Sequence, residues 1–286
     1  MLKRKSLFSF IILLFFAFGY NSIIANAEEN HELSTTQKEH MRQLGFSEQN
    51  IESMTLDEYS HYENSIPVEP FVQTETIYKI TSDQDGEVKK VEQFNEEDGL
   101  LEMNLENYSF PAATAASCSG TICTETTSWM SMTTTATKLG NGRTMLHNNF
   151  TWLKNPNVNL TDMVGLTYND SAVIEPSTIN FSYKWKDGVG DHSRSYKDMK
   201  KSPQGLAATF DIQGIGSNAG TSNHHGYISV EVSKGNKNDV SANAFGHYTH
   251  TTFSFNISVT IKTGDIGLGW TTAETKMTST AIKFNF

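Results

Sequence analysis

The sequence predicts a mainly β protein: a C-terminal antiparallel β-sandwich or open barrel, preceded by a small acidic segment of helices and a β-hairpin. Three observations support this class. Apolar and polar residues alternate in many stretches after residue 118, turn-forming clusters separate those stretches, and helix-start signals gather in residues 34–63. Alternation with a period of two puts one face of a strand in a core and the other in water.

Residues 118–286 are expected to form the β-sandwich domain. The stretch TINFSYKWKD, for example, sets large apolar residues against polar ones. Turn signals at 140–142, 187–191, 234–239 and 263–265 divide the strands, which is typical of sandwiches and open barrels. The expected inward positions are Ile179, Phe181, Tyr183, Trp185, Leu206, Ala208, Phe210, Ile212, Ile228, Val230, Val232, Phe253, Phe255, Ile257, Val259, Ile261, Ile282, Phe284 and Phe286.

Residues 28–65 are expected to be an acidic helical segment. Thr36 precedes Glu39 by three residues, and Thr55 precedes Glu58 by three, which is the spacing of a capping box. Ser47 marks a further helix start, and Gly45 is placed where the first helix should end.

Residues 66–110 are expected to be an acidic linker that contains a β-hairpin, followed by a small-residue connector at 111–117. TETIYKIT and VKKVEQF alternate in strand fashion on either side of SDQDGE, whose Asp-Gly pair suits a tight turn.

The first 27 residues have the features of a secretory signal peptide. A basic start at Lys3, Arg4 and Lys5 is followed by an apolar run and then by Ala25-Asn26-Ala27. The apolar run is shorter than the roughly 20 residues of a membrane-spanning helix. We expect cleavage after Ala27 and a secreted, extracellular protein.

Charge divides the remaining chain into two regions. Residues 28–107 carry 20 acidic and 5 basic residues, whereas residues 108–286 carry 12 acidic and 14 basic ones. The acidic balance argues against nucleic acid as a partner, because phosphate binding needs concentrated Lys and Arg. The acidic leader could dock on the weakly basic β domain or simply keep it soluble.

Two cysteines, Cys118 and Cys123, lie in the stretch SCSGTICTE. An even number of cysteines in an exported chain predicts a disulfide bond, here one that pins the start of the β domain. A redox-active pair is the alternative, but the spacing is not that of a CxxC motif.

A calcium loop is an alternative interpretation of the hairpin turn. Counted from Thr81, Asp83, Asp85 and Glu92 fall at positions 3, 5 and 12 of such a loop. Position 1 is a threonine and the flanking residues are β-rich, so the plain turn is favoured and no cofactor is expected.

Four histidines lie within a short span: His224, His225, His247 and His250. Strand parity carried back from Ile261 puts His247 inward and His250 outward, so these two cannot share a metal on one uninterrupted strand. His225 and His250, both outward by parity, could hold zinc with a third ligand. A structural or surface role is the favoured interpretation.

A basic cluster with interleaved aromatic residues is the predicted binding patch. Such a patch could meet an anionic cell-wall polymer, a membrane surface, a secreted protein or the acidic leader. An ordinary solvated strand and loop is an equal alternative. The patch comprises Lys184, Trp185, Lys186, Arg194, Tyr196, Lys197, Lys200 and Lys201.

Parts of the chain resemble uncharacterised secreted proteins of Gram-positive bacteria. LGFSEQNIESMTLDEY is similar to a segment that follows their signal peptides, and the β domain from SCSGTICTETTSWMSM through SANAFGHYTH to FNF is similar to their C-terminal part. The resemblance implies no activity.

Together these features predict a secreted non-enzymatic binding protein that acts at the cell envelope or on an extracellular partner. The sequence has no G-x-S-x-G, H-E-x-x-H or phosphate-binding glycine loop. Two alternatives remain open. The amphipathic tail 251–286 could form a pore like that of a β-pore-forming toxin, and the histidines could serve a metallo-hydrolase.

Overall fold

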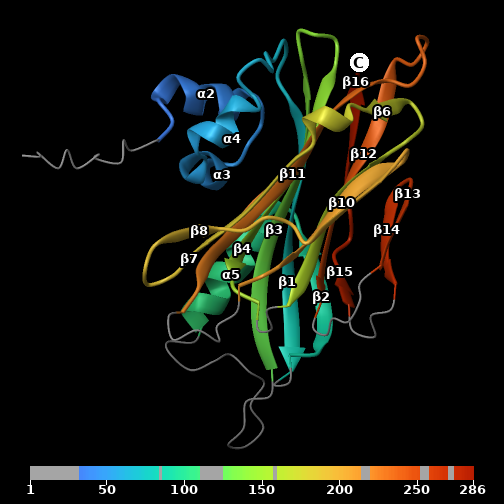
Figure 1. Ribbon diagram of the computed structural model, residues 1–286. Helices are drawn as coiled ribbons and strands as arrows, with labels where there is room; N and C mark the ends of the chain where they lie inside the picture. The colour runs from blue at the N-terminus through green and yellow to red at the C-terminus, as the bar shows by residue number, and fades with distance from the viewer. Residues whose placement is uncertain are drawn as a thin grey trace, which may run out of the picture. The chain divides into compact units, whose positions relative to one another are not determined.

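The structure is a computed structural model that describes residues 32–83, 86–109, 125–156, 160–213, 220–251, 258–269 and 274–286. Its described strands form two antiparallel sheets and a two-stranded ribbon (Figure 1). No described helix is long enough and apolar enough to cross a membrane.

The larger sheet has eight strands in the order β2-β1-β3-β4-β11-β7-β8, with β6 paired to β11. Its long central strands position the candidate site. Their bounds are β1 (Val72–Asp83), β2 (Val88–Phe94), β3 (Glu125–Lys138), β4 (Thr144–Lys154), β6 (Ala172–Ile174), β7 (Asn180–Lys186), β8 (Asp191–Ser193) and β11 (Ser222–Lys234).

The smaller sheet has six strands in the order β15-β12-β5-β10-β9, with β16 paired to β12. The ribbon pairs β13 (Ser258–Lys262) with β14 (Asp265–Gly269). The strands of the smaller sheet are β5 (Thr161–Tyr168), β9 (Asp198–Ser202), β10 (Gly205–Asp211), β12 (Ser241–Thr251), β15 (Glu274–Lys276) and β16 (Thr280–Asn285), and a short 3₁₀ turn spans Pro176–Thr178.

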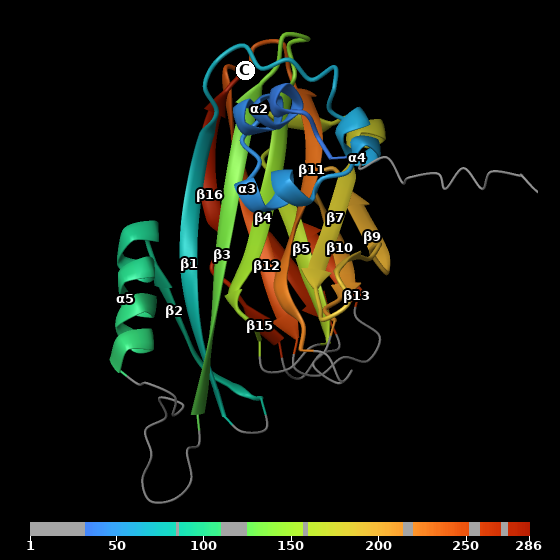
Figure 2. The ribbon, with the colours of Figure 1, turned by 90° about the vertical axis from the view of Figure 1, so that its left-hand side faces the viewer.

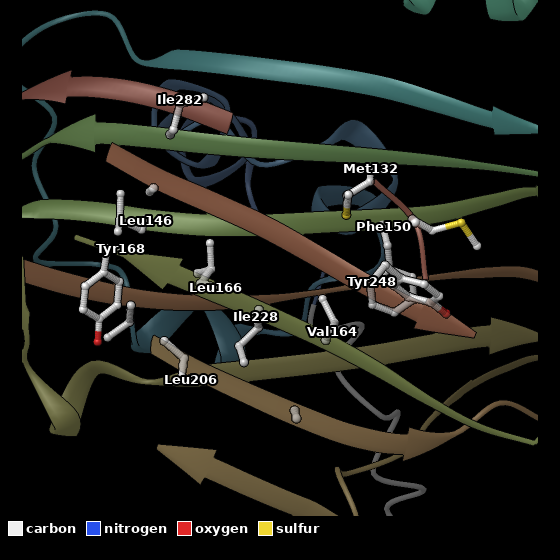
Figure 3. Close-up of a cluster of buried hydrophobic side chains, with 14 of the residues drawn as sticks. Met132, Leu146, Phe150, Val164, Leu166, Tyr168, Leu206, Ile228, Tyr248 and Ile282 are labelled. Atoms are coloured by element: carbon white, nitrogen blue, oxygen red, sulfur yellow. The ribbon is translucent and has the colours of Figure 1, made fainter. Parts of the chain in front are cut away.

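The two sheets enclose one hydrophobic core, which makes the fold a β-sandwich as predicted. In Figure 3, side chains of the larger sheet, such as Phe150 and Ile228, meet those of the smaller sheet, such as Val164 and Tyr248. The alternation read from the sequence is confirmed in β7, β10, β11 and β16, whose expected inward residues lie in this core or pack against it.

Val259 and Ile261 lie elsewhere, so their predicted place in the main core is wrong. They pack with Leu268 around a separate small cluster of Met163, Ala207 and Ile266. Alternation identified an apolar face correctly, but that face covers the outer side of the smaller sheet. Phe253, Phe255 and Ile257 lie outside the described residues.

Between residue 32 and the first described strand lie three short helices: α2 (Thr35–Gln43), α3 (Glu48–Ser53) and α4 (Leu56–Ser60). The predicted caps at Ser47 and Thr55 are confirmed, and Thr55 forms its capping box with Glu58. The first helix instead begins with a capping box of Ser34 and Gln37. The predicted Thr36–Glu39 box is wrong because Thr36 lies inside the helix.

Gly45 follows α2 with a φ of 86°, a conformation that suits glycine. The predicted hairpin at 74–94 is also confirmed as β1 and β2, with Gly86 at a φ of 82°.

Strand β1 joins the acidic segment to the β domain. It pairs with β3 from Val72 to Asp83, so residues on both sides of the predicted connector at 111–117 share one sheet. Leu33–Phe286 accordingly form one compact unit.

A further helix, α5 (Glu96–Ser109), occupies residues predicted to be linker. Its first turn carries Glu96, Glu97 and Asp98. Their negative charges stabilise the helix because the N-terminus is the positive end of the helix dipole. The side chain of Asn95 accepts a bond from the Asp98 backbone N–H at 2.9 Å, as a cap does. Its apolar residues do not follow a clear helical period, so the sequence pattern did not indicate it.

Helix α5 approaches β1 closely at Gly99. A Cβ at this position would lie 2.7 Å from the Cβ of Ile77. We therefore expect Gly99→Ala to lower the free energy of unfolding by about 1 kcal/mol or more, because one element must shift. Helix propensity alone predicts a gain of about 1 kcal/mol.

Urea denaturation of Gly99→Ala measures the sign of this effect. Gly267→Ala is the control, since a Cβ there meets nothing within 4 Å. A stabilised Gly99→Ala variant would show that α5 does not pack on Ile77 as described.

Candidate functional site

The outward face of the larger sheet carries mostly polar residues in register. Because β1, β3, β4, β11 and β7 are neighbours, cross-strand partners form rows across the sheet. One row is Ile77, Ser131, Thr151, His225 and Lys184; the next is Glu75, Thr133, Asn149, Tyr227 and Ser182; the third is Gln73, Thr135, His147, Ser229 and Asn180.

Helices α2–α4, residues 35–60, form a helical cap over one part of this face (Figure 2). Apolar residues of the cap and its flanks pack against Leu139, Met145 and Tyr227 of the sheet side. The residues of the cap and its flanks in this cluster are Leu33, Met41, Leu44, Phe46, Ile51, Met54 and Tyr62. These apolar residues of the cap and its flanks are thus buried on the β domain.

Polar contacts fix the cap in register with the sheet. Asn50 donates from Nδ2 to Asn149 Oδ1 at 2.9 Å, and the hydroxyls of Tyr62 and Ser229 lie 2.8 Å apart. Such buried bonds specify one arrangement, because an unpaired partner would cost about 1–3 kcal/mol.

An ion pair attaches helix α4 of the cap to strand β7. Lys184 Nζ lies 2.5 Å from Glu58 Oε2, and Ser182 donates to Glu58 Oε1 at 2.9 Å. Burial alone would raise the pKa of Glu58, but Lys184 and these hydrogen bonds hold it below its ordinary value. One residue of the predicted basic patch therefore binds the acidic leader.

His147 lies buried beneath the cap and is neutral there. Its Nε2 donates to the Leu44 carbonyl at 3.0 Å, and its Nδ1 accepts from Asn149 at 2.9 Å. Its ring stacks on Phe46 with centroids 4.6 Å apart. Burial lowers its pKa to about 4.

Next to the cap, the sheet face is hollowed into a groove that we call the outer-face groove. It consists of three adjoining hollows of about 450, 440 and 330 Å³. The first two share Arg42 and Phe71, and the last two share Ser47, Glu48, Glu75, Thr133 and Asn149. The groove thus runs from the 67–71 segment, past α2 and α3, to Leu100 of α5 and Leu153 of β4.

The charge of this groove is predominantly acidic. Its lining includes five acidic residues and one basic residue, which are Glu39, Glu48, Glu69, Glu75, Glu96 and Arg42. Arg42 is already engaged, because its Nε lies 2.6 Å from Glu48 and its Nη1 lies 3.5 Å from Glu39. Glu69 lies 3.8 Å from Lys138. Glu75 and Glu96 are therefore the groove carboxylates without an ion-pair partner among the described residues, and their charge favours cationic groups.

Glu75 is half-buried at the point where two of the hollows meet. It accepts a hydrogen bond from Ser131 Oγ at 2.6 Å, and no described Lys or Arg pairs with it. Burial raises the pKa of Glu75 above its ordinary value, and nearby Glu96 adds to this shift, whereas the Ser131 and Thr133 side chains oppose it.

The histidines lie on different faces, and the predicted parity of His247 and His250 is wrong. His250 points between the sheets, where its Nδ1 lies 2.8 Å from Asp162 Oδ1. His247 faces the opposite side of β12, with Nε2 2.8 Å from Thr167 Oγ1, which also accepts from Gly264 of the ribbon. Parity failed because β12 ends at residue 251 and β13 begins at residue 258.

The structure does not bring His225 and His250 together as a zinc pair. His225 lies outward as expected, but under the cap, with Nε2 2.9 Å from Ser53 Oγ. His224 points inward, with Nδ1 2.8 Å from the Tyr183 hydroxyl. Within the described ranges, no group of three His, Cys, Asp or Glu side chains could hold a metal ion.

The residues of the predicted basic patch are dispersed. Trp185 is a core residue only 7% exposed, whereas Tyr196 is 45% exposed. Lys186 pairs with Asp191 at 3.2 Å, Lys197 pairs with Asp211 at 3.0 Å, and Arg194 donates to Gln213 at 2.8 Å. Lys200 and Lys201 are exposed on β9 of the other sheet.

The two remaining predicted sites fall partly or wholly outside the described residues. Cys118 and Cys123 lie outside them, as does Asp85 of the calcium loop. Of the other calcium residues, Asp83 Oδ2 lies 3.0 Å from Lys89, and Glu92 pairs with Lys90 at 2.6 Å. These carboxylates bind lysines within the hairpin.

No protein-family model matches the chain, and neither does any curated protein. Among solved structures, the collagen-binding domain of a Staphylococcus aureus adhesin is similar at a TM-score of 0.30 and 10% identity, over 51% of this chain and 89% of that one. ACE19, the collagen-binding subdomain of the Enterococcus faecalis surface protein ACE, is similar at 0.29 and 5%, over 51% and 88%.

The T6 backbone pilin of serotype M6 Streptococcus pyogenes is similar at a TM-score of 0.28 and 10% identity, over 77% of this chain and 64% of that one. The strand pairing within the present chain itself shows the β-sandwich.

Proposed function

We propose that this chain is a non-enzymatic binding protein that works outside the cell and holds an extended polypeptide in the outer-face groove. The observation that carries the proposal is the groove itself. Three adjoining open hollows follow the sheet from the 67–71 segment to α5, which suits an extended chain better than a compact small molecule.

The lining of the groove supports a polypeptide ligand. Hydroxyl and amide groups of Ser131, Thr133 and Gln73 can hydrogen-bond a backbone, and Phe71 and Leu153 supply apolar contact. Export of the chain, expected from its first 27 residues, would put this groove outside the cell.

Filling the groove should abolish binding. We expect peptides selected from a random display library by residues 28–286 to bind Thr133→Trp at least about tenfold more weakly, because the new indole occupies the two hollows that share Thr133. Fluorescence anisotropy with labelled peptides measures the affinity.

Two further variants make this test decisive. Gln73→Trp also obstructs the groove, and its exposed position should tolerate the change without loss of folding. Val189→Trp is the control, since Val189 is 87% exposed in the turn between β7 and β8. Undiminished binding to both groove variants, or a failure to select any peptide, would refute the proposal.

A further inference from the structure

We infer that the bound polypeptide is basic, and that one of its lysine or arginine side chains pairs with Glu75 at the centre of the outer-face groove. This inference rests on the proposed function and names the chemistry of its partner. The Glu75 carboxylate lies where two hollows join, so a side chain from a peptide in either hollow can reach it.

Glu75 has no cationic partner among the described residues, and this lack carries the inference. A half-buried carboxylate is costly unless a cation or sufficient hydrogen bonds compensate its charge. The Ser131 hydroxyl supplies one hydrogen bond and the cross-strand neighbour Thr133 also stabilises the carboxylate, but no described Lys or Arg forms an ion pair with Glu75. A cation from outside the chain would complete this site.

The surroundings of Glu75 favour a long basic side chain. Leu100 and Leu153 line the same hollow, are 37% and 38% exposed, and can pack against the methylene groups of lysine or arginine. Glu96 lines it too and adds a second negative charge without an ion-pair partner among the described residues. Arg42 does not neutralise them, because Glu48 binds its guanidinium through two hydrogen bonds of 2.6 and 2.9 Å.

Substitution Glu75→Gln tests the pairing, because glutamine keeps the shape and an acceptor for Ser131 while removing the charge. The probe is a fluorescein-labelled peptide of alternating lysine and threonine. The control is the same peptide with each lysine replaced by glutamine. We expect the lysine peptide to bind Glu75→Gln about tenfold or more weakly than the wild-type chain, and to lose affinity with added salt.

Glu97→Gln is the matched control. It removes the same charge from the first turn of α5, at an exposed residue that does not line the groove. It should change the affinity less than about twofold. Thermal unfolding of Glu75→Gln should occur at the wild-type temperature or above it, since the variant removes a half-buried charge.

The outcomes separate this inference from the proposed function. Equal binding of the lysine peptide by wild type and Glu75→Gln, with Thr133→Trp and Gln73→Trp still blocking selected peptides, overturns the pairing and leaves the groove as the binding site. Equal binding of the lysine and glutamine peptides also overturns it. Failure of both groove variants to weaken any peptide overturns both proposals.

Discussion

Asp162→Ala is expected to lower the free energy of unfolding by about 3–5 kcal/mol, because it leaves buried polar partners without an acceptor. Asp162 is fully buried between the sheets. It accepts hydrogen bonds from the Tyr248 hydroxyl and from His250 Nδ1, and Trp152 donates to the same Tyr248 oxygen at 3.0 Å. Removing the carboxylate thus disrupts a network that joins β4, β5 and β12.

Urea denaturation of Asp162→Ala beside Asp162→Asn measures this network. Asparagine keeps the shape and can still accept from Tyr248 and donate to the other tautomer of His250, so it should cost clearly less than alanine. A loss below about 1 kcal/mol in Asp162→Ala would contradict the buried arrangement.

The second large effect is a steep loss of stability on acidification from pH 6.5 to pH 4. Burial lowers the pKa of His147, His224 and His247 from 6.5 to about 4. Between pH 6.5 and pH 4 the unfolded chain binds protons at these histidines that the folded chain does not. Their contribution to the free energy of unfolding is therefore fully present above pH 6.5 and is lost as the pH falls toward 4. Each histidine contributes up to about 3 kcal/mol.

The groups that face these histidines do not reverse this sign. His147 hydrogen-bonds the neutral Leu44 carbonyl and Asn149 and stacks on Phe46. Beside His224, the proximity of His225 lowers its pKa further. Around His247, Lys276 lowers and Asp265 raises the pKa, and burial exceeds both.

Denaturation midpoints measured at several pH values check this prediction. His147→Gln should reduce the slope of unfolding free energy against pH by up to about 1.4 kcal/mol per pH unit. The reason is that the unfolded and folded chains then differ by one bound proton fewer. A stability that stays constant between pH 6.5 and pH 4.5 would show that these histidines are not buried and neutral.

Much of the sandwich could be predicted because its strands bury one face. Alternation identified the core positions of β7, β10, β11 and β16 correctly. It failed for His250, because parity does not pass between separate strands. Helix α5 was missed because contacts with β1 stabilise it; for example, Lys79 Nζ lies 3.2 Å from Glu102.

The groove could not be predicted, because its walls come from segments far apart in the sequence. Glu75 and Thr133 are neighbours only because β1 pairs with β3. One signal was present: the outward positions of TSWMSMTTTATKL are Ser131, Thr133, Thr135 and Thr137. An outward polar face was interpreted as solvated, although part of it lies under the helical cap and part in the groove.

The predicted basic patch and the outer-face groove would bind partners of opposite charge. Lysines on β7–β9 would select an anionic ligand, whereas Glu75 and Glu96 would select a cationic one. Lys184 is already bound to Glu58, which leaves the patch weaker than its sequence indicated.

Photo-crosslinking tests the central claim, a polypeptide bound in the outer-face groove, most directly. A peptide selected by residues 28–286 is given a photoreactive residue, irradiated in complex with the protein, and the attachment sites are mapped by mass spectrometry. We predict attachment to residues 71–77 of the 67–71 segment and β1, to residues 47–49, and to residues 131–133 of β3. Attachment to Lys200, Lys201 and their neighbours on β9, with none in the groove, would contradict the account.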